Sequence, residues 1–319
     1  MSKQKLILTG KHGRPSTKEA YRQMQSGTLV QRRQVFSGRG PRRILKNEYY
    51  RTYRDNDPEI MHKVNTMTLE DSIVVRWGTR EDMTTNKGSI VYNKSAAIKN
   101  ATDKKHSREL FEEKSVSSPR LVRPNNFENS MLPIIARPLV HSKGSNFVTL
   151  NSREAFIRHY NINNGSWYYS EFIDKQREFR IHAAHGKVLA VMEKIKPSTG
   201  NIAWNRAQND TDPFTYIKWG DVDTQNLKCV LDVALEAVKA LELDFGGVDV
   251  MLKDGRAYVL EVNTSPTLNT SPYVAGRWGM YFDWLFRKEE RREHWNSSEF
   301  KKGSSLIWKN KQLRDEENN

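Results

Sequence analysis

The sequence predicts an α+β protein, in which antiparallel hairpins alternate with amphipathic helices. One hairpin is predicted from 179 to 195, where two apolar runs flank the turn His185-Gly186. A second is predicted from 246 to 263 around Asp254-Gly255. Between them, apolar residues recur at helical spacing from Asp223 to Leu241. Hairpins combined with separate helices are typical of the α+β class.

The other elements follow from local periodicity and turn residues. Folded structure is expected to begin near Leu69, and the polar stretch 197–219 is expected to form an ordered loop. One helix is predicted from Ser95 to about Lys114, before a proline. Another is predicted from 152 to 160, with its first residue as the cap. The remaining predicted strands are 72–78, 90–92, 132–138, 147–150 and 167–173.

The composition is polar, with 37% apolar and 28% charged residues in a chain of 319. No run of eighteen apolar residues is present, which excludes a transmembrane helix. The first residues lack the cleavage pattern of a secretory signal. The single Cys229 cannot form an internal disulfide and lies in a helical apolar pattern. We therefore expect a cytoplasmic protein without a membrane partner.

The net charge of +14 is unevenly distributed along the chain. Residues 1–65 hold fifteen Lys and Arg against five Asp and Glu, a net charge of +10. Tyrosines and a phenylalanine are interleaved with these cations, as they are in segments that bind single-stranded nucleic acid. The segment therefore predicts either an acidic partner, such as nucleic acid or another acidic polymer, or a solvated basic extension without a dedicated ligand.

The hairpin around Gly255 predicts a metal site. If it is regular, Asp249 lies opposite Glu261, and Asn263 follows on the same face. Two facing carboxylates repel each other unless a cation lies between them. Carboxylate and amide oxygens are ligands that suit Mg²⁺. The opposite face is expected to pack in the core through Val248, Val250, Leu252, Tyr258, Leu260 and Val262.

The chain resembles the ATP-grasp superfamily, which includes D-alanine–D-alanine ligase, glutathione synthetase and the ribosomal-protein glutamate ligases. The motif Gly-Val-Asp at 247–249, followed by Glu-Val-Asn-Thr-Ser-Pro at 261–266, is similar to its metal-binding end. The resemblance runs through about residues 70–270. It implies two α+β subdomains that clasp ATP, with ATP and Mg²⁺ as cofactors.

The resemblance assigns nucleotide-binding residues to the segment before and within the lid. The Asp-Lys pair at 103–104 is similar to the family's lid entrance, so Lys104 is expected to reach the nucleotide phosphates. Arg137 stands where the family has a second lysine, a departure that keeps the charge but changes the donor geometry. The loop that follows resembles the family's phosphate-covering loop, with candidates His141, Lys143 and Gly144.

The resemblance also covers the linker and the strand after it. The linker's candidates for adenine and ribose contacts are Glu171, Phe172, Ile173 and Asp174. Glu178-Phe179-Arg180 is similar to the family's Glu-x-Arg motif, so Glu178 is expected at the nucleotide. Arg180 is expected to stabilise charge on the transferring phosphoryl group. Lys194, or Lys196, would add positive charge nearby.

Substrate contacts have the weakest signals in the sequence. Arg76 ends a predicted strand that faces the expected cleft, and Asn205 lies in the polar loop. Both are candidates for substrate contacts, and Arg76 is equally compatible with a structural role.

The predicted organisation is a basic N-terminal extension (1–65), a pre-grasp segment (66–103), a lid subdomain (104–170), an ATP-grasp core with the metal site (171–287) and a charged C-terminal tail (288–319).

The predicted function is an ATP- and Mg²⁺-dependent carboxylate–amine ligase that acts through an acyl phosphate and releases ADP and phosphate. Two alternatives stay open at this point. One is a phosphotransferase on the same scaffold, which would turn over ATP without an amine acceptor. The other is a nucleic-acid-binding protein in which the nucleotide site is regulatory, and which would bind nucleic acid without hydrolysing ATP. The sequence leaves the acid and the amine unidentified.

Overall fold

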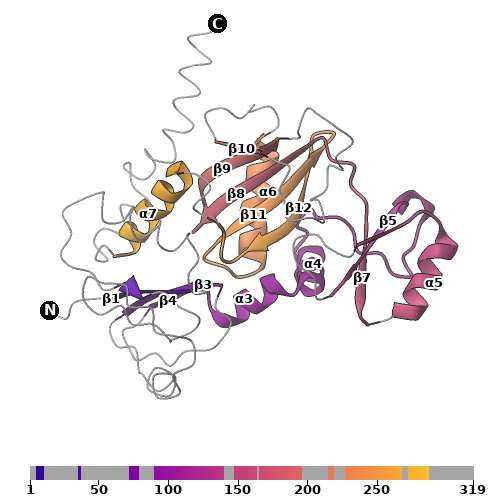
Figure 1. The fold of residues 1–319 in the computed structure, drawn as a ribbon, viewed down its shortest axis with the longest axis horizontal. Coiled ribbons are helices and arrows are strands. Elements are labelled where there is room, and N and C mark those ends of the chain that lie inside the picture. Colours follow the sequence, from indigo (N-terminus) through magenta and orange to yellow (C-terminus); the bar gives the residue numbers. More distant parts are fainter. Residues whose placement is uncertain are drawn as a thin grey trace, which may run out of the picture.

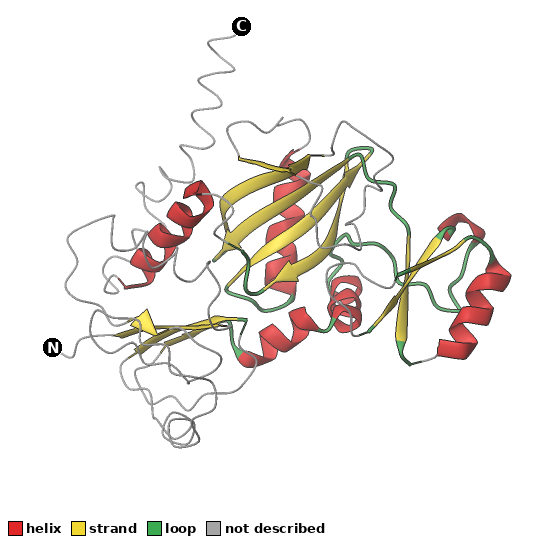
Figure 2. Ribbon diagram, in the orientation of Figure 1, coloured by secondary structure: helices red, strands yellow, loops and turns green. Residues whose placement is uncertain are grey.

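The computed structural model describes residues 5–10, 35–36, 72–78, 90–139, 147–163, 165–195, 215–218, 227–267 and 272–286. A large sheet lies at the centre, with a smaller sheet on either side (Figure 1). Figure 2 shows that both helices and strands contribute to each region, which confirms the predicted α+β class.

The central sheet has five antiparallel strands in the order β10-β9-β8-β11-β12. Helix α6 (Leu227–Ala240) covers one face, and its apolar side packs on the strands through buried residues such as Val230 and Ala234. A fully buried valine or leucine side chain contributes about 1.5–3 kcal/mol. The strands are β8 (Arg177–Ala184), β9 (Lys187–Ile195), β10 (Thr215–Lys218), β11 (Phe245–Lys253) and β12 (Arg256–Asn263).

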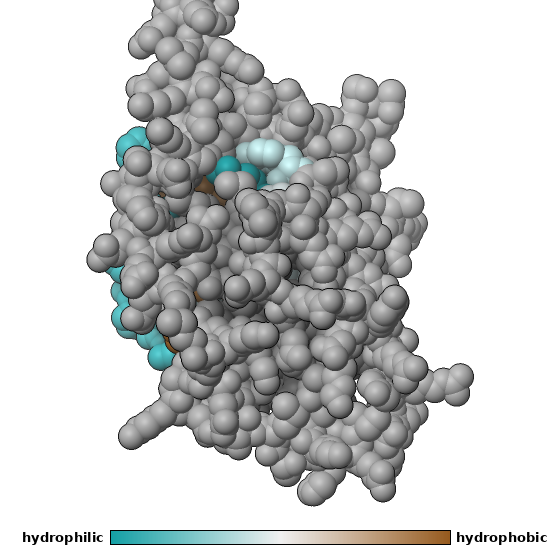
Figure 3. Space-filling view, turned by 90° about the vertical axis from the view of Figure 1, so that its left-hand side faces the viewer, coloured by the Kyte–Doolittle hydropathy of each residue, from teal (hydrophilic) through white to brown (hydrophobic). Residues whose placement is uncertain are grey.

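An aromatic cluster covers part of the other face of this sheet. Helix α7 (Pro272–Phe286) places Trp278 and Phe282 against Phe245 of β11 and Trp77 of β3. All four rings are buried, with Trp77 only 1% exposed. In Figure 3, the described residues in view are teal to nearly white, with small brown areas. The aromatic cluster covers the part of the face formed by β9 and the start of β11.

The N-terminal sheet is parallel, in the order β2-β1-β3-β4. Its strands are β1 (Lys5–Gly10), β2 (Val35–Phe36), β3 (Ser72–Trp77) and β4 (Ile90–Tyr92). Strand β1 pairs with β3 along its whole length, so folded structure begins well before Leu69, where it was expected. The reason is that the short apolar patch Leu6-Ile7-Leu8 finds its strand partner more than sixty residues away, which local periodicity does not reveal.

The region predicted to be the lid contains a three-stranded antiparallel sheet in the order β6-β5-β7, covered by α5. Phe156 of the helix is fully buried against Tyr169 of β7 and Phe127. This small core is separate from that of the central sheet. The elements are the 3-10 helix η1 (Asn129–Met131), β5 (Ile134–Pro138), β6 (Val148–Leu150), α5 (Arg153–Asn163) and β7 (Trp167–Glu171).

The helix predicted from Ser95 to Lys114 is instead two helices, α3 (Ser95–Thr102) and α4 (Lys104–Glu113). Asp103 separates them with extended backbone angles. Its carboxylate accepts hydrogen bonds from the backbone N–H groups of Lys105 and His106, at 3.1 and 3.0 Å. An aspartate in this position caps a new helix, so the break turns α4 toward the central sheet.

Two further elements differ from the sequence prediction. Strand β10 forms within the stretch expected to be a loop, because it pairs with β9 at the edge of the sheet. Helix α7 has no predicted counterpart, although Pro272 at its first turn and the spacing of its aromatic residues are ordinary helix signals. Among the described residues, no helix combines the length and apolarity that a membrane crossing requires.

Candidate active site

The predicted metal ligands lie where β11 and β12 pair. Asp249 is directly opposite Glu261, and Gly247 is opposite Asn263, which confirms the predicted facing position of the two carboxylates. Nearer the turn the register differs by one residue, since Val250 pairs with Val259. A β-bulge therefore inserts Leu260 between the turn and the carboxylate pair.

Because of the bulge, part of the core face predicted for β12 is wrong. Tyr258 and Leu260 were expected in the core, but Ala257 and Val259 are buried there, at 5% and 0% exposed. The reason is the two-residue turn, where Asp254 and Gly255 both have positive φ, at 48° and 74°. That turn sets a register one residue away from the one assumed, and only the bulge restores the predicted pairing at Glu261.

Each of the two carboxylates is paired with a cation. Arg180, opposite Asp249 on β8, donates from Nε to Oδ1 and from Nη2 to Oδ2, both at 2.6 Å. Lys104, at the start of α4, lies 2.9 Å from Glu261 Oε2. Asn263 Nδ2 donates to Glu261 Oε1 at 3.3 Å. The face thus joins β8, β11, β12 and α4 in one polar row.

Burial and charge act in opposite directions on this pair. Burial favours the protonated form of Glu261, but the charge and hydrogen bond of Lys104, with Arg180 behind it, outweigh burial and lower the pKa of Glu261 to about 2. At Asp249, burial prevails over the fork of Arg180, and the charge of Glu261 adds to it, so the pKa of Asp249 is raised. Additional positive charge at this point would stabilise both ionised carboxylates.

A second buried charge cluster lies beside the first. Glu178 on β8 accepts a hydrogen bond from Lys194 Nζ of β9 at 3.0 Å and a second from Lys175 Nζ. The three side chains are only 6–10% exposed. Burial works to raise the pKa of Glu178, but the two lysines outweigh it and the pKa is lowered. Lys175 was missed by the sequence analysis, because its position in a linker loop has no periodicity that would point to Glu178.

In the region predicted to be the lid, Arg137 has a buried hydrogen-bond donor without a partner among the described residues. Arg137 on β5 is half-buried, and its Nε is buried and makes no hydrogen bond within the described structure. A buried donor of this kind fits an anionic ligand such as a nucleotide phosphate. The other predicted lid contacts, His141, Lys143 and Gly144, lie outside the described residues.

The linker joins the lid sheet to the central sheet, between β7 and β8. Glu171 accepts hydrogen bonds from the backbone N–H and the Nε of Arg120, at 2.9 and 3.1 Å. Phe172 is exposed, Ile173 is half-buried and Asp174 is exposed. The apolar surface of Phe172 is therefore accessible to a planar ligand, while Glu171 is held in place by the segment before the lid.

The two substrate candidates are placed differently. Arg76 is buried on β3, at 3% exposed. The end of β3 lies close to the segment that follows β12, because a Cβ added at Gly78 would lie 2.8 Å from the Cβ of Ser265, two residues after Asn263. The N-terminal sheet therefore contacts the site through Gly78. Asn205 lies outside the described residues.

The donor set fits magnesium better than a thiolate or imidazole metal. Within the described parts of the chain, no three His, Cys, Asp or Glu side chains come together as a metal cluster. The two carboxylates and the amide supply hard oxygen atoms, and Mg²⁺ is commonly held by one or two carboxylates plus water and phosphate oxygens. Four cations, Lys104, Lys175, Arg180 and Lys194, surround three carboxylates, which suits a site that also takes an anion.

The chain is similar to known proteins in both sequence and fold. Residues 129–276 match the family model of the RimK-like ATP-grasp domain. A "probable alpha-L-glutamate ligase" of Psychromonas ingrahamii is 26% identical over 226 residues, which cover 66% of this chain and 71% of that protein. A protein of the same description from Vibrio vulnificus is 24% identical over 253 residues, covering 71% and 81%.

Solved structures show the same fold at low sequence identity. D-alanine–D-alanine ligase from Bacillus anthracis, complexed with ATP, has a TM-score of 0.55 at 12% identity, over 93% of this chain and 100% of that one. The ATP-grasp ligase PsnB, complexed with its minimal precursor, has a TM-score of 0.56 at 14% identity, over 89% and 99%. These likenesses show that the fold is that of the ATP-grasp ligases. Within this fold, residues 129–276 are the part that matches a RimK-like ATP-grasp domain.

Proposed function

We propose that this protein joins a carboxylic acid to an amine in an ATP- and Mg²⁺-dependent reaction that passes through an acyl phosphate and releases ADP and phosphate. The observation that supports it most is the polar row of Asp249, Glu261 and Arg180, in register across three strands. The names of the relatives make glutamate the first amine to test.

The need for activation explains the chemistry of the site. A carboxylate resists attack by an amine, because an oxide is a poor leaving group. When bound, ATP would supply the phosphoryl group that makes the acid reactive, and Mg²⁺ held by Asp249, Glu261 and Asn263 would offset the phosphate charge. The carboxylate oxygen forms a bond to the γ-phosphorus as the bond to ADP breaks. The amine nitrogen then bonds to the acyl carbon, phosphate leaves, and the amine gives up a proton.

The chain's own cations are suited to the charge that develops. Arg180 is held by its two bonds to Asp249, so its positive charge is already positioned beside the proposed metal site and can stabilise phosphoryl oxygens with little reorganisation. Lys194 and Lys175 are bound to Glu178 in a buried position beside it. Buried cations interact with an anion more strongly than exposed ones, since water screens them less.

The lid and linker would hold the nucleotide and exclude water. Arg137 of β5 and Lys104 of α4 are proposed to contact the phosphates, and Glu171 with Phe172, Ile173 and Asp174 to line the adenine and ribose. An acyl phosphate hydrolyses in water, so a lid that closes over it protects the intermediate. His141, Lys143 and Gly144 are proposed phosphate contacts on the same grounds of resemblance, and Arg76 and Asn205 are proposed substrate contacts.

The test uses the full chain with ATP, Mg²⁺, a panel of acids and glutamate, and measures ADP release together with the mass of the products. An ADP signal that requires both an acid and an amine, with a product heavier by the amine less water, supports the proposal. ADP release without any amine, with a phosphorylated product, would instead favour the phosphotransferase alternative. Salt-dependent nucleic-acid binding without ATP turnover would favour the regulatory alternative.

Variants of the hairpin locate the reaction. Asp249→Asn and Glu261→Gln are expected to lower the rate on the order of a hundredfold or more, because each removes a charge that faces the phosphates. Asp254→Asn is the matched control: it lies in the turn of the same hairpin, is exposed, and keeps a residue that tolerates its positive φ. Parental turnover by Asp249→Asn and Glu261→Gln would refute the assignment of this hairpin.

A further inference from the structure

Arg108 makes hydrogen bonds to the backbone at the β12 bulge, although it is not one of the predicted site residues. It lies on α4, one helical turn after Lys104, and is only 4% exposed. Its Nη1 donates to the carbonyl oxygen of Val259 at 2.9 Å, and its Nη2 donates to that of Leu260 at 2.8 Å. Figure 1 places α4 between the β12 edge of the central sheet and the lid.

Two successive carbonyls on one guanidinium are a signature of the bulge. In a regular strand, the carbonyl groups of neighbouring residues point to opposite sides of the strand, so one side chain at the edge reaches only one of them. A bulge turns the backbone locally and breaks this alternation. Arg108 can therefore form both bonds only while Leu260 is in the bulged arrangement.

The bulge decides where Glu261 points. The turn register pairs Val250 with Val259, and without an extra residue it would continue by pairing Asp249 with Leu260. A shift of one residue sends every following side chain to the other face of the sheet. Glu261 would then point toward α6, where Val259 and Val248 are buried, and the carboxylate pair would be lost.

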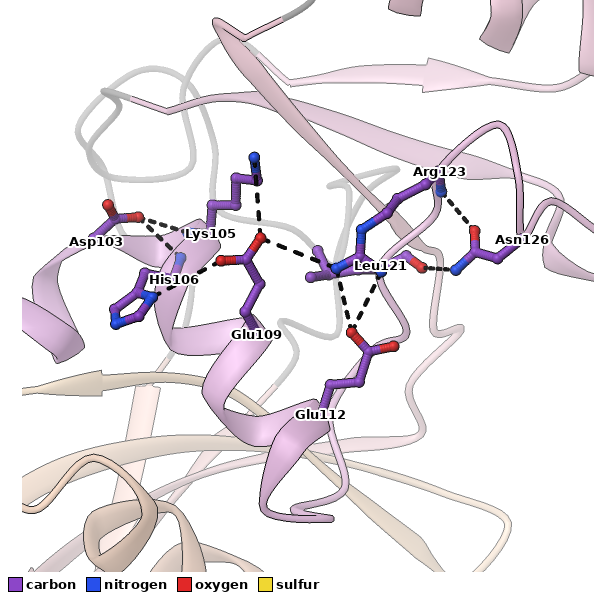
Figure 4. A network of polar contacts seen from close by, with 8 residues as sticks. All are labelled: Asp103, Lys105, His106, Glu109, Glu112, Leu121, Arg123 and Asn126. Atoms are coloured by element: carbon purple, nitrogen blue, oxygen red, sulfur yellow. Dashed lines mark hydrogen bonds and ion pairs between the residues drawn. The ribbon is translucent and has the colours of Figure 1, made fainter.

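Contacts on both sides of helix α4 hold it in place, and they thereby fix the position of Arg108 relative to β12. On its outer face, Glu109 and Glu112 form ion pairs with Arg123, which lies in the segment between α4 and η1 (Figure 4). On its inner face, Lys104 pairs with Glu261 directly. Just after α4, the carbonyl oxygen of Ser117 accepts a hydrogen bond from the N–H of Val259 at 2.9 Å.

We propose that Arg108 is a positioning residue for the metal site: by holding the carbonyls of Val259 and Leu260 it maintains the bulge that aims Glu261 and Asn263 toward Asp249. This inference rests on the proposed function, because the metal-binding role of Glu261 belongs to it. Arg108 itself touches neither the metal nor the reacting atoms. Groups that orient metal ligands typically change metal affinity by about 10–100-fold when they are removed.

The variants separate the two hydrogen bonds from mere packing. Arg108→Met keeps the length and apolar body of the side chain but leaves both carbonyls without their donor. Arg108→Lys keeps the charge with a single point donor, which serves one carbonyl well and not both. Lys114→Met is the matched control, since Lys114 is an exposed cation directly after the same helix and pairs with the neighbouring Glu113 at 2.7 Å.

The measurement is the binding of Mn²⁺ to the full chain by electron paramagnetic resonance, in the presence of a non-hydrolysable ATP analogue. We expect the dissociation constant to rise by about tenfold or more for Arg108→Met, by a smaller factor for Arg108→Lys, and not at all for Lys114→Met. Hydrogen exchange of the amides from 259 to 263 should quicken in the same order, because the bulge is less constrained.

The opposite outcomes are distinct. Unchanged Mn²⁺ binding by Arg108→Met, with a lowered melting temperature, would show that Arg108 only stabilises the sheet edge and would overturn the inference. If Arg108→Met does not fold, Mn²⁺ binding by Arg108→Lys at parental strength overturns it equally. Mn²⁺ binding that survives Asp249→Asn would refute the proposed metal site itself, whatever the Arg108 variants show.

Discussion

The burial of His182 predicts that the free energy of unfolding falls in mild acid. This histidine is fully buried on β8, two residues after Arg180, and its Nδ1 accepts a hydrogen bond from Trp278 Nε1 at 3.0 Å. Since the indole can only donate, Nδ1 carries no proton and the neutral ring is protonated at Nε2. Burial, with a smaller contribution from Arg180, lowers the pKa of His182 to about 3.

The sign follows from which state binds the proton. In the unfolded chain histidine titrates near its ordinary pKa of about 6.5, whereas folded His182 stays neutral down to about pH 3. Its contribution is fully present above pH 6.5 and is lost as the pH falls from there toward 3, because the unfolded state binds the proton first. The slope is about 1.4 kcal/mol per pH unit, and lowering the pH from 7.5 to 4.5 should cost about 2.5 kcal/mol.

The assay is urea unfolding of the parent and His182→Gln between about pH 7.5 and 4.5. Glutamine is chosen because its carbonyl can still accept from Trp278. The absolute stability of the variant is not the readout, since other groups titrate in both proteins. The expected result is that the free energy of unfolding of the parent falls toward that of the variant by about 1.4 kcal/mol per unit below pH 6.5.

Two results would refute this reasoning or show that it is not specific. Parallel pH profiles of the parent and His182→Gln would mean that the buried ring takes up a proton in the folded state as readily as in the unfolded one. His106→Gln, which removes an exposed histidine of α4, is the control for the loss of a histidine as such. A shared change in both variants would point to the loss of any histidine and not to burial.

Three further predictions concern the lid, the helix break and the basic segment. Arg137→Ala should raise the apparent constant for ATP more than that for the acid, and an unchanged ATP affinity by calorimetry would mean that Lys104, Lys105 or Lys143 holds the phosphates instead. Asp103→Ala should lower the free energy of unfolding by about 1 kcal/mol, since it removes the α4 cap, and chemical denaturation with no change would contradict the capping role. If residues 1–65 recruit an acidic polymer, binding of single-stranded nucleic acid by the full chain should weaken steeply with salt. Because β1 belongs to the N-terminal sheet, this is tested better by replacing charges than by a deletion, and the residues to replace with glutamine are Arg32, Arg33, Arg42 and Arg43. Unaltered nucleic-acid binding by this variant would refute recruitment.

The spacing of polar side chains along single strands could be predicted from sequence. Glu178 and Arg180 are two residues apart, as are Glu261 and Asn263, so each pair shares a face of its strand. The turn residues Asp254-Gly255 predict the hairpin, and the apolar period predicts α6. These are local properties, because strand alternation and helical period depend only on neighbouring residues. The order of the motifs then sufficed for the resemblance to ATP-grasp enzymes.

Contacts between distant segments were decided only by the tertiary structure. The predicted facing of Asp249 and Glu261 is confirmed, but it depends on a bulge at Leu260 that the alternation of the sequence does not show. Likewise, Lys175 reaches Glu178 through a loop, and Arg108 reaches β12 from a helix about 150 residues earlier. A hydrophobic pattern reports which side of an element is buried, but not which charge lies across from it. That partner is selected by the packing of the whole fold, where a buried charge must find its counter-charge.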